Sequence, residues 1–158
     1  MSEETYRYLL TRRWDDPTGP NVLWIMLNPS TADETEDDPT IRKCVGFSKL
    51  WGCSALSVVN LFALRSTDPR KLYTAKNPVG PENNEWIRNV VKTASFVVIA
   101  WGARGSFMDR DYSVLSILKA AGVEVFCLGT TKSGEPKHPL YISYSTKPVK
   151  FPSQWRNP

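Results

Sequence analysis

The sequence is poor in the residues that usually hold metal centres. Its 158 residues include a single histidine and three cysteines, Cys44, Cys53 and Cys127. No two cysteines have CxxC spacing, and three thiolates alone cannot complete a four-ligand zinc or iron–sulfur set. We therefore expect reduced cysteines in the core of a cytoplasmic protein, with no metal and no cofactor.

Long hydrophobic runs are also missing. No stretch approaches the roughly 20 apolar residues that a membrane-spanning helix needs. The start of the chain, residues 1–5, is acidic and has no apolar signal-peptide segment. The sequence therefore predicts a protein without a membrane partner.

Neither sign of charge dominates the chain. Lys and Arg number 20 against 16 Asp and Glu, which gives a net charge of +4. This mild positive charge makes nucleic acid a candidate partner without requiring one. There is no internal repeat and no linker, so residues 1–158 are expected to form a single domain and a monomer.

What the sequence does contain is a series of short apolar runs that alternate with helical patterns. The runs predict strands over residues 22–27, 56–60, 96–101 and 123–128. The stretches between them predict helices over residues 40–51, 85–93 and 112–121. We expect an α/β fold of three layers (α/β/α), with a central four-stranded, mainly parallel sheet. Residues 5–14 are expected to add an antiparallel edge strand, and the tail 147–158 to lie along the surface.

Helix caps and inward faces follow from the same patterns. Asp38 is expected to cap the first helix, and Asn83 or Asn84 the second. Apolar spacing points Trp86 and Val90 of the second helix toward the core. In the third helix the inward residues are expected to be Val114, Leu115 and Leu118.

Lone polar residues fall where the predicted strands end. Asn28 follows the first strand, Asn60 ends the second, Trp101-Gly102 ends the third, and His138 follows a loop after the fourth. The carboxyl ends of parallel strands line the binding crevice of open α/β sheets. Two amides and an imidazole would therefore converge on one small polar ring.

These motifs resemble those of the uracil-DNA glycosylase superfamily. The matching pairs, in order, are Asn28-Pro29, Asn60-Leu61, Trp101-Gly102 and His138-Pro139, between residues 22 and 140. The longer sequences around the first, second and last motifs are similar to those of a small phage and bacterial family of unknown function, DUF1643. The resemblance implies a uracil-DNA glycosylase-like fold and recognition of a base in DNA.

The sequence departs from that superfamily in three places. Asn28 stands where the most active glycosylases have an aspartate, and an amide orients water but cannot act as a general base. Residues 140–143, Leu-Tyr-Ile-Ser, replace the usual Ser-Pro-Leu-Ser stretch that wedges the duplex. Three cysteines are one too few for the iron–sulfur branch.

Roles for the base-binding residues follow from their chemistry. Asn60 offers donors and an acceptor to the edge of a pyrimidine. His138 would donate to a base oxygen as negative charge grows on it, and Asn28 would hold the attacking water. Phe62 would stack on the base, and Pro29 and Ser30 would complete the base-binding group.

Phosphate or backbone contacts are expected from Arg65, Gly102, Arg104 and Leu140. Arg65 opens a basic stretch that runs to Lys76, and Gly102 and Arg104 lie in a loop whose amides suit an anion. Leu140 is a candidate for the residue that wedges the duplex, with Tyr141 as the alternative.

Each of these residues also has an ordinary explanation. An asparagine at position 28 is also typical of a turn at the end of a strand. Asn60 is also typical of a buried amide that is bonded to the backbone, and His138 of an ordinary loop residue. Phe62 fits the core, and Arg65 a solvated face. The acidic run 33–38 fits a solvated loop, a divalent-cation site or a gate that repels phosphate.

The leading functional hypothesis is glycosylase-like recognition, with N-glycosidic cleavage, of a pyrimidine or modified base in DNA. One alternative is a catalytically silent module that binds nucleic acid or nucleotide. The other is an enzyme that acts on free nucleotides in base modification.

Overall fold

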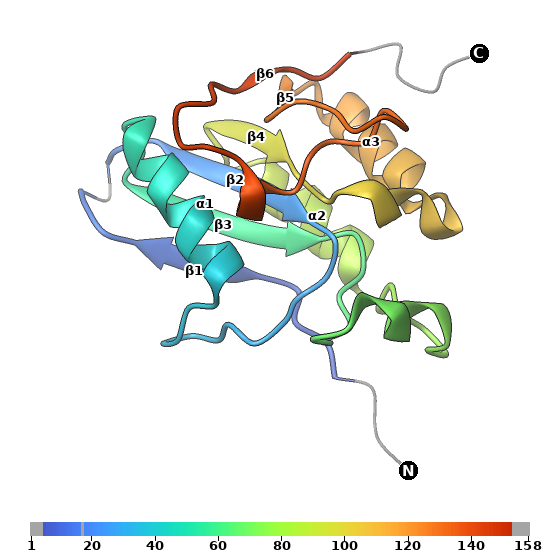
Figure 1. The fold of residues 1–158 in the computed structure, drawn as a ribbon. Coiled ribbons are helices and arrows are strands. Elements are labelled where there is room, and N and C mark those ends of the chain that lie inside the picture. Colours follow the sequence, from blue (N-terminus) through green and yellow to red (C-terminus); the bar gives the residue numbers. More distant parts are fainter. Residues whose placement is uncertain (1–4, 17, 153–158) are drawn as a thin grey trace.

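The computed structural model describes residues 5–16 and 18–152 and confirms an α/β fold (Figure 1). Its strands are β1 (Leu10–Arg13), β2 (Asn21–Met26), β3 (Ala55–Asn60), β4 (Phe96–Ile99), β5 (Val125–Cys127) and β6 (Val149–Lys150). Its α-helices are α1 (Pro39–Leu50), α2 (Asn83–Val91) and α3 (Arg110–Ala121). Three short 3-10 helices are η1 (Pro69–Tyr73), η2 (Ala103–Asp109) and η3 (Pro139–Tyr141).

The described strands form one sheet in the order β1-β3-β2-β4-β5-β6. The four inner strands, β3, β2, β4 and β5, run parallel, and β1 pairs antiparallel with β3 as expected. The register sets Met26 at the end of β2 beside Asn60 at the end of β3. This pairing brings the segments that follow the two strands to the same edge of the sheet.

Residues 149 and 150 of the tail are exposed at the surface, as predicted, and they also form a strand that the sequence does not predict. They form β6, which pairs antiparallel with β5 through Phe126 and Cys127. A two-residue strand carries no periodic signal, and its formation depends on the free edge of β5. Residues 153–158 of the predicted tail lie outside the described residues.

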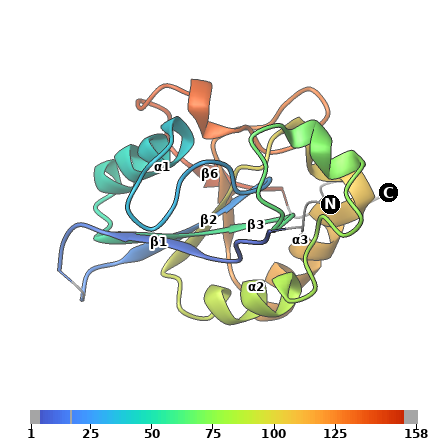
Figure 2. The same cartoon turned by 90° about the horizontal axis from the view of Figure 1, so that it is seen from below.

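The helices cover the two faces of the sheet, so the layers are helix, sheet and helix (Figure 2). On one face, α1 buries Ile41, Cys44 and Phe47 against Trp24. On the other face, α2 and α3 pack apolar side chains against alternate residues of the inner strands. All three cysteines are buried and unpaired, so their assignment to the core is confirmed.

The prediction for α2 is wrong in its start and in one inward residue. The helix begins at Asn83, which is itself fully buried, and Ile87 takes the inward position expected for Trp86. Trp86 instead is 38% exposed and stacks on Tyr8, with the ring centroids 6.0 Å apart. The wide indole thus covers the N-terminal segment rather than the core.

The start of α3 also differs from the prediction. The helix begins at Arg110, two residues early, and buries Ile117, while Leu115 is only partly buried. Within residues 5–16 and 18–152, no helix combines the length and the apolar character needed to cross a bilayer.

Candidate functional site

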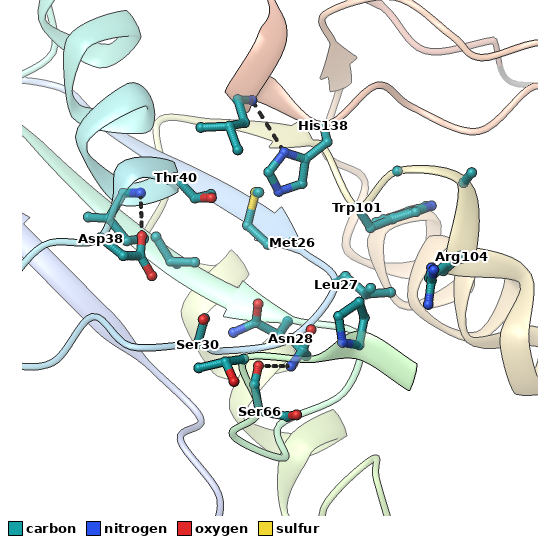
Figure 3. A pocket seen from close by; sticks show the side chains of 18 of the residues that line it. Met26, Leu27, Asn28, Ser30, Asp38, Thr40, Ser66, Trp101, Arg104 and His138 are labelled. Atoms are coloured by element: carbon teal, nitrogen blue, oxygen red, sulfur yellow. Dashed lines mark hydrogen bonds between the residues drawn. The ribbon is translucent and has the colours of Figure 1, made fainter. Parts of the chain in front are cut away.

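A cavity of about 570 Å³ opens at the carboxyl ends of the parallel strands, on the face that α1 covers. Its walls come from segments far apart in the sequence: the chain after β2, the end of β3, the start of α1, the turn after β4 and η3 (Figure 3). In this view Asp38 and Thr40 lie on one side, and Trp101 and Arg104 on the other. Asn28, Asn60 and His138 all line this cavity, as the shared-pocket prediction requires.

Asn60 ends β3 and is the most buried of the predicted polar residues, with 2% of its surface exposed. Its side chain lines the cavity and makes no hydrogen bond to any described residue. Among the described residues, its amide atoms are not counted with the buried polar atoms that lack a partner, so the amide group opens onto the cavity. The amide of Asn60 is therefore ready to bind a ligand that offers both a donor and an acceptor.

Two buried polar side chains hold the backbone at Asn60. Asn83 Nδ2 donates to the carbonyl oxygens of Asn60 and Leu61, at 2.9 and 3.0 Å. Arg110 Nε donates to the same Leu61 oxygen at 2.8 Å, and burial lowers the Arg110 pKa to about 10. Because Asn83 and Arg110 are the first residues of α2 and α3, the starts of both helices fix the end of β3.

Sequence reasoning missed this arrangement. The sequence predicts Asn83 only as a possible helix cap, and the predicted third helix, residues 112–121, begins after Arg110. An arginine or asparagine at a helix start is ordinary, and neither pattern reveals that the side chain turns back toward a neighbouring strand.

Asn28 follows β2, and its side-chain nitrogen is already engaged. Nδ2 donates to the carbonyl oxygens of Pro29 at 3.1 Å, Leu64 at 3.4 Å and Ser66 at 3.0 Å. Figure 3 shows the bond to Ser66. These bonds join the loop after β2 to the loop after β3. The interpretation of Asn28 as a turn residue thus explains the bonds of its amide nitrogen. Its Oδ1 is able to accept a hydrogen bond from a molecule in the cavity.

His138 lies across the cavity from Asn28 (Figure 3). Its Nδ1 accepts a hydrogen bond from the Leu140 backbone N–H at 3.2 Å, so the neutral ring carries its proton on Nε2. Burial lowers the His138 pKa, and the negative charge of Asp38 opposes that shift. Neutral His138 is therefore a hydrogen-bond donor at neutral pH.

Asp38 brings a carboxylate to the cavity. As predicted, it caps α1: Oδ1 accepts from the Ile41 N–H at 2.9 Å, and Oδ2 accepts from the Ala32 N–H at 3.2 Å. The sequence revealed the cap but not that Asp38 and Thr40 face the ligand space. The same holds for Arg7, which lines the cavity from the segment before β1.

Four further predicted residues also line the cavity: Ser30, Gly102, Arg104 and Leu140. Gly102 has φ of 79°, a left-handed conformation that favours glycine, and its N–H donates to Pro136 at 2.9 Å. This turn ends β4 and sends the chain into η2. The guanidinium of Arg104 lies over the Tyr73 ring, 5.9 Å from its centroid.

Three predicted residues do not line the cavity. Phe62 is fully buried in the core and packs against Phe107, so in this conformation it has no face free for a base. Pro29 is buried beside the cavity without lining it, and Arg65 is exposed outside it. Phe62 belongs to the same core cluster as its neighbour Leu61, because the chain bends after β3 and enters the layer of α2 and α3.

The acidic run 33–38 forms an ordered loop. Asp33 Oδ1 accepts from the N–H groups of Thr35 and Glu36, and these bonds lower the Asp33 pKa. Arg12 pairs with Asp37 at 2.7 Å. Within the described residues, no group of three or more His, Cys, Asp or Glu side chains is placed to hold a metal ion.

Comparison with known protein families shows which family the chain belongs to. A family model described as a protein of unknown function, DUF1643, matches residues 7–140, and the chain belongs to this family. No curated protein and no solved structure matches the chain.

Proposed function

We propose that the cavity binds a pyrimidine or modified base and that the protein acts as a DNA glycosylase-like enzyme. The observation that carries this proposal is Asn60, an amide that is 98% buried and faces the cavity without a partner. A pyrimidine edge presents adjacent donors and acceptors, which is the pattern that one amide side chain can satisfy. The cavity is also large enough for a base and its sugar.

The cavity residues supply roles for N-glycosidic hydrolysis. Water forms a bond to the sugar C1′, the C1′–N bond breaks, and the electron pair of that bond passes to the base. His138 Nε2–H would donate to the base oxygen where this charge develops, while Asn28 Oδ1 would accept a hydrogen bond from the water. The water's proton would pass to the departing base or to solvent.

The resemblance to uracil-DNA glycosylases supports this proposal. The residues that carry it, Asn28, Asn60, Trp101-Gly102 and His138, come from four separate segments and line one cavity. A base inside a duplex must leave the stack to enter such a cavity. The proposed substrate is therefore a flipped or single-stranded base.

The decisive experiment is a screen of oligonucleotides that contain uracil, mismatched or modified bases, with abasic-site formation as the readout. We expect cleavage of at least one substrate by the wild-type protein. Asn60→Ala should weaken its binding about tenfold or more, since an unpaired base edge costs about 1–3 kcal/mol. The exposed Asn89 on α2 offers a matched control, and Asn89→Ala should leave binding unchanged.

A silent binding module is the second candidate, and a specific observation favours it. Both oxygens of Asp38 already accept backbone N–H groups, and the Asn28 nitrogen is occupied. Among the described residues that line the cavity, the carboxylate of Asp38 is therefore already engaged in holding the backbone. Base binding that is lost in Asn60→Ala, with no abasic site formed from any substrate, would favour this candidate over the enzyme.

A further inference from the structure

Arg7 lines the cavity from a segment that lies outside the predicted motifs. Its backbone N–H donates to Ala63 at 2.9 Å, and the Arg65 N–H donates to Thr5 at 2.8 Å, on either side of an antiparallel bridge between Tyr6 and Leu64. Diagonal neighbours across an antiparallel pair share one face and come within reach of long side chains. The pairing thus sets Arg7 and Arg65 beside each other.

Two like charges held close together destabilise the folded chain unless a counter-charge lies between them. Among the described residues, neither Arg7 nor Arg65 forms a direct ion pair with a carboxylate. Arg7 donates through Nη1 to the Ala32 carbonyl oxygen, and its buried Nε has no hydrogen-bond partner. A guanidinium at the cavity wall therefore keeps unused donors.

The electrostatic surroundings agree with this geometry. Burial and the neighbouring Arg65 lower the Arg7 pKa to about 10, and the Arg65 effect is larger than the opposing effect of Asp38. Asp38 and Asp33 are the nearby acids, and both use their carboxylates to accept backbone N–H groups. The local field at Arg7 therefore favours an anion.

We propose that Arg7 and Arg65 form a phosphate subsite at the edge of the cavity, so that the ligand is a nucleotide rather than a free base or nucleoside. The base and sugar of this ligand rest on the proposed function. The phosphate subsite itself does not depend on it. Arginine suits this role because its planar donors bind two phosphate oxygens at once. The phosphate belongs either to a free nucleoside monophosphate or to a DNA strand.

Inorganic phosphate is a probe that tests the subsite without the base. Thermal unfolding would be measured in phosphate and in chloride at equal ionic strength, for the wild type, Arg7→Gln, Arg65→Gln and Arg88→Gln. Arg88 is an exposed arginine on α2, in the opposite helical layer, so its variant changes net charge equally. We expect phosphate to raise the Tm of the wild type and Arg88→Gln alike, because a ligand of the native state stabilises it.

Arg7→Gln and Arg65→Gln should each lose most of this stabilisation, with phosphate affinity reduced about tenfold. Arg7→Gln also removes the bond to Ala32, so this variant could unfold. The Arg65 side chain makes no hydrogen bond among the described residues, and Arg65→Gln gives an answer in that event. Equal phosphate effects in all four proteins, or none in the wild type, would overturn the subsite.

Calorimetric titration then distinguishes the two phosphate sources. Deoxyuridine 5′-monophosphate should bind more tightly than deoxyuridine, and Arg65→Gln should remove that advantage. If DNA supplies the phosphate, a uracil-containing oligonucleotide should also lose affinity in Arg65→Gln. If no oligonucleotide of the base screen is bound or cleaved while inorganic phosphate still stabilises the wild type, the proposed function fails and the subsite stands.

Discussion

Asn28 and Asn60 make an instructive pair, because both follow buried parallel strands that lie side by side. The amide nitrogen of Asn28 donates to three backbone carbonyl oxygens, whereas the amide of Asn60 makes no hydrogen bond to a described residue. Asn28 is half-buried and Asn60 almost fully buried, so the more buried amide is the less satisfied. The amide of Asn28 stabilises the walls of the cavity, and the amide of Asn60 lies where a ligand in the cavity would contact it.

This contrast separates stability from binding. A polar group that bonds its own backbone contributes to folding, while an unpartnered one reduces stability and is retained where it serves a ligand. Substitution by alanine should therefore lower the free energy of unfolding at Asn28 and lower the ligand affinity at Asn60. Substitutions at Asn83, Asn28, Asn60 and His138 should change the free energy of unfolding in that order, from the largest effect to the smallest.

Asn83→Ala should have the largest effect on stability. It removes both hydrogen bonds to the end of β3 and leaves the buried Asn60 carbonyl oxygen without its Asn83 donor. We expect a loss of about 2–4 kcal/mol in the free energy of unfolding. Urea denaturation of this variant beside Asn89→Ala, which changes an exposed asparagine of the same helix, gives the measurement. Equal stabilities would show that the start of α2 does not hold Asn60 in place.

Asn28→Ala should destabilise the protein by about 1–2 kcal/mol, because three partly buried carbonyl oxygens lose a donor. Denaturant unfolding measures this change. The same variant should lower turnover, since Oδ1 is proposed to hold the water. A variant with wild-type stability would contradict the conclusion that this amide stabilises the loops after β2 and β3.

Asn60→Ala should change the free energy of unfolding by no more than about 0.5 kcal/mol, because the amide has no protein partner to lose. Its effect should appear in ligand affinity instead. Unfolding and nucleotide titration of one preparation would compare the two quantities directly. A destabilisation as large as that of Asn28→Ala would remove the distinction between the two asparagines.

His138 should add a small pH-dependent term to stability. Burial lowers its pKa below 6.5 in the folded protein, so the unfolded chain binds the proton more readily. Stability from neutral His138 is therefore complete above pH 6.5 and declines as the pH falls toward the folded pKa. The difference in unfolding free energy between wild type and His138→Gln, followed from pH 7.5 to about 5, measures this term. A difference that does not change with pH would mean that the ring is not buried in its neutral form.

His138 also tests the proposed chemistry. If base cleavage occurs, His138→Ala should lower the rate by roughly 10²–10³-fold, which is the usual effect of removing one oxyanion donor.

Much of the fold was predictable because apolar runs report burial directly. The four inner strands and three α-helices lie where the sequence pattern puts them, with shifts of at most two residues at their ends. The site could be predicted only for residues whose place follows from their position at the end of a strand. Asn28, Asn60 and His138 converge because strand ends share an edge, and this rule needs no knowledge of packing.

The remaining features depend on contacts that sequence patterns do not encode. Phe62 follows Asn60 by two residues, and only the local direction of the chain decides that it enters the core. Arg7 reaches the cavity because its segment pairs with residues near Ala63, far along the chain. Neither residue carries a periodic signal that predicts its surroundings.

The two outer strands have a consequence for behaviour at high concentration. β1 has four residues, including Arg12 and Arg13, and β6 has only two, ending at Lys150. Exposed sheet edges invite pairing between molecules, and short edges with positive charge discourage it. The long apolar strands lie between these edges, where another chain cannot add to them. The fold thus protects its most aggregation-prone segments with its least hydrophobic strands.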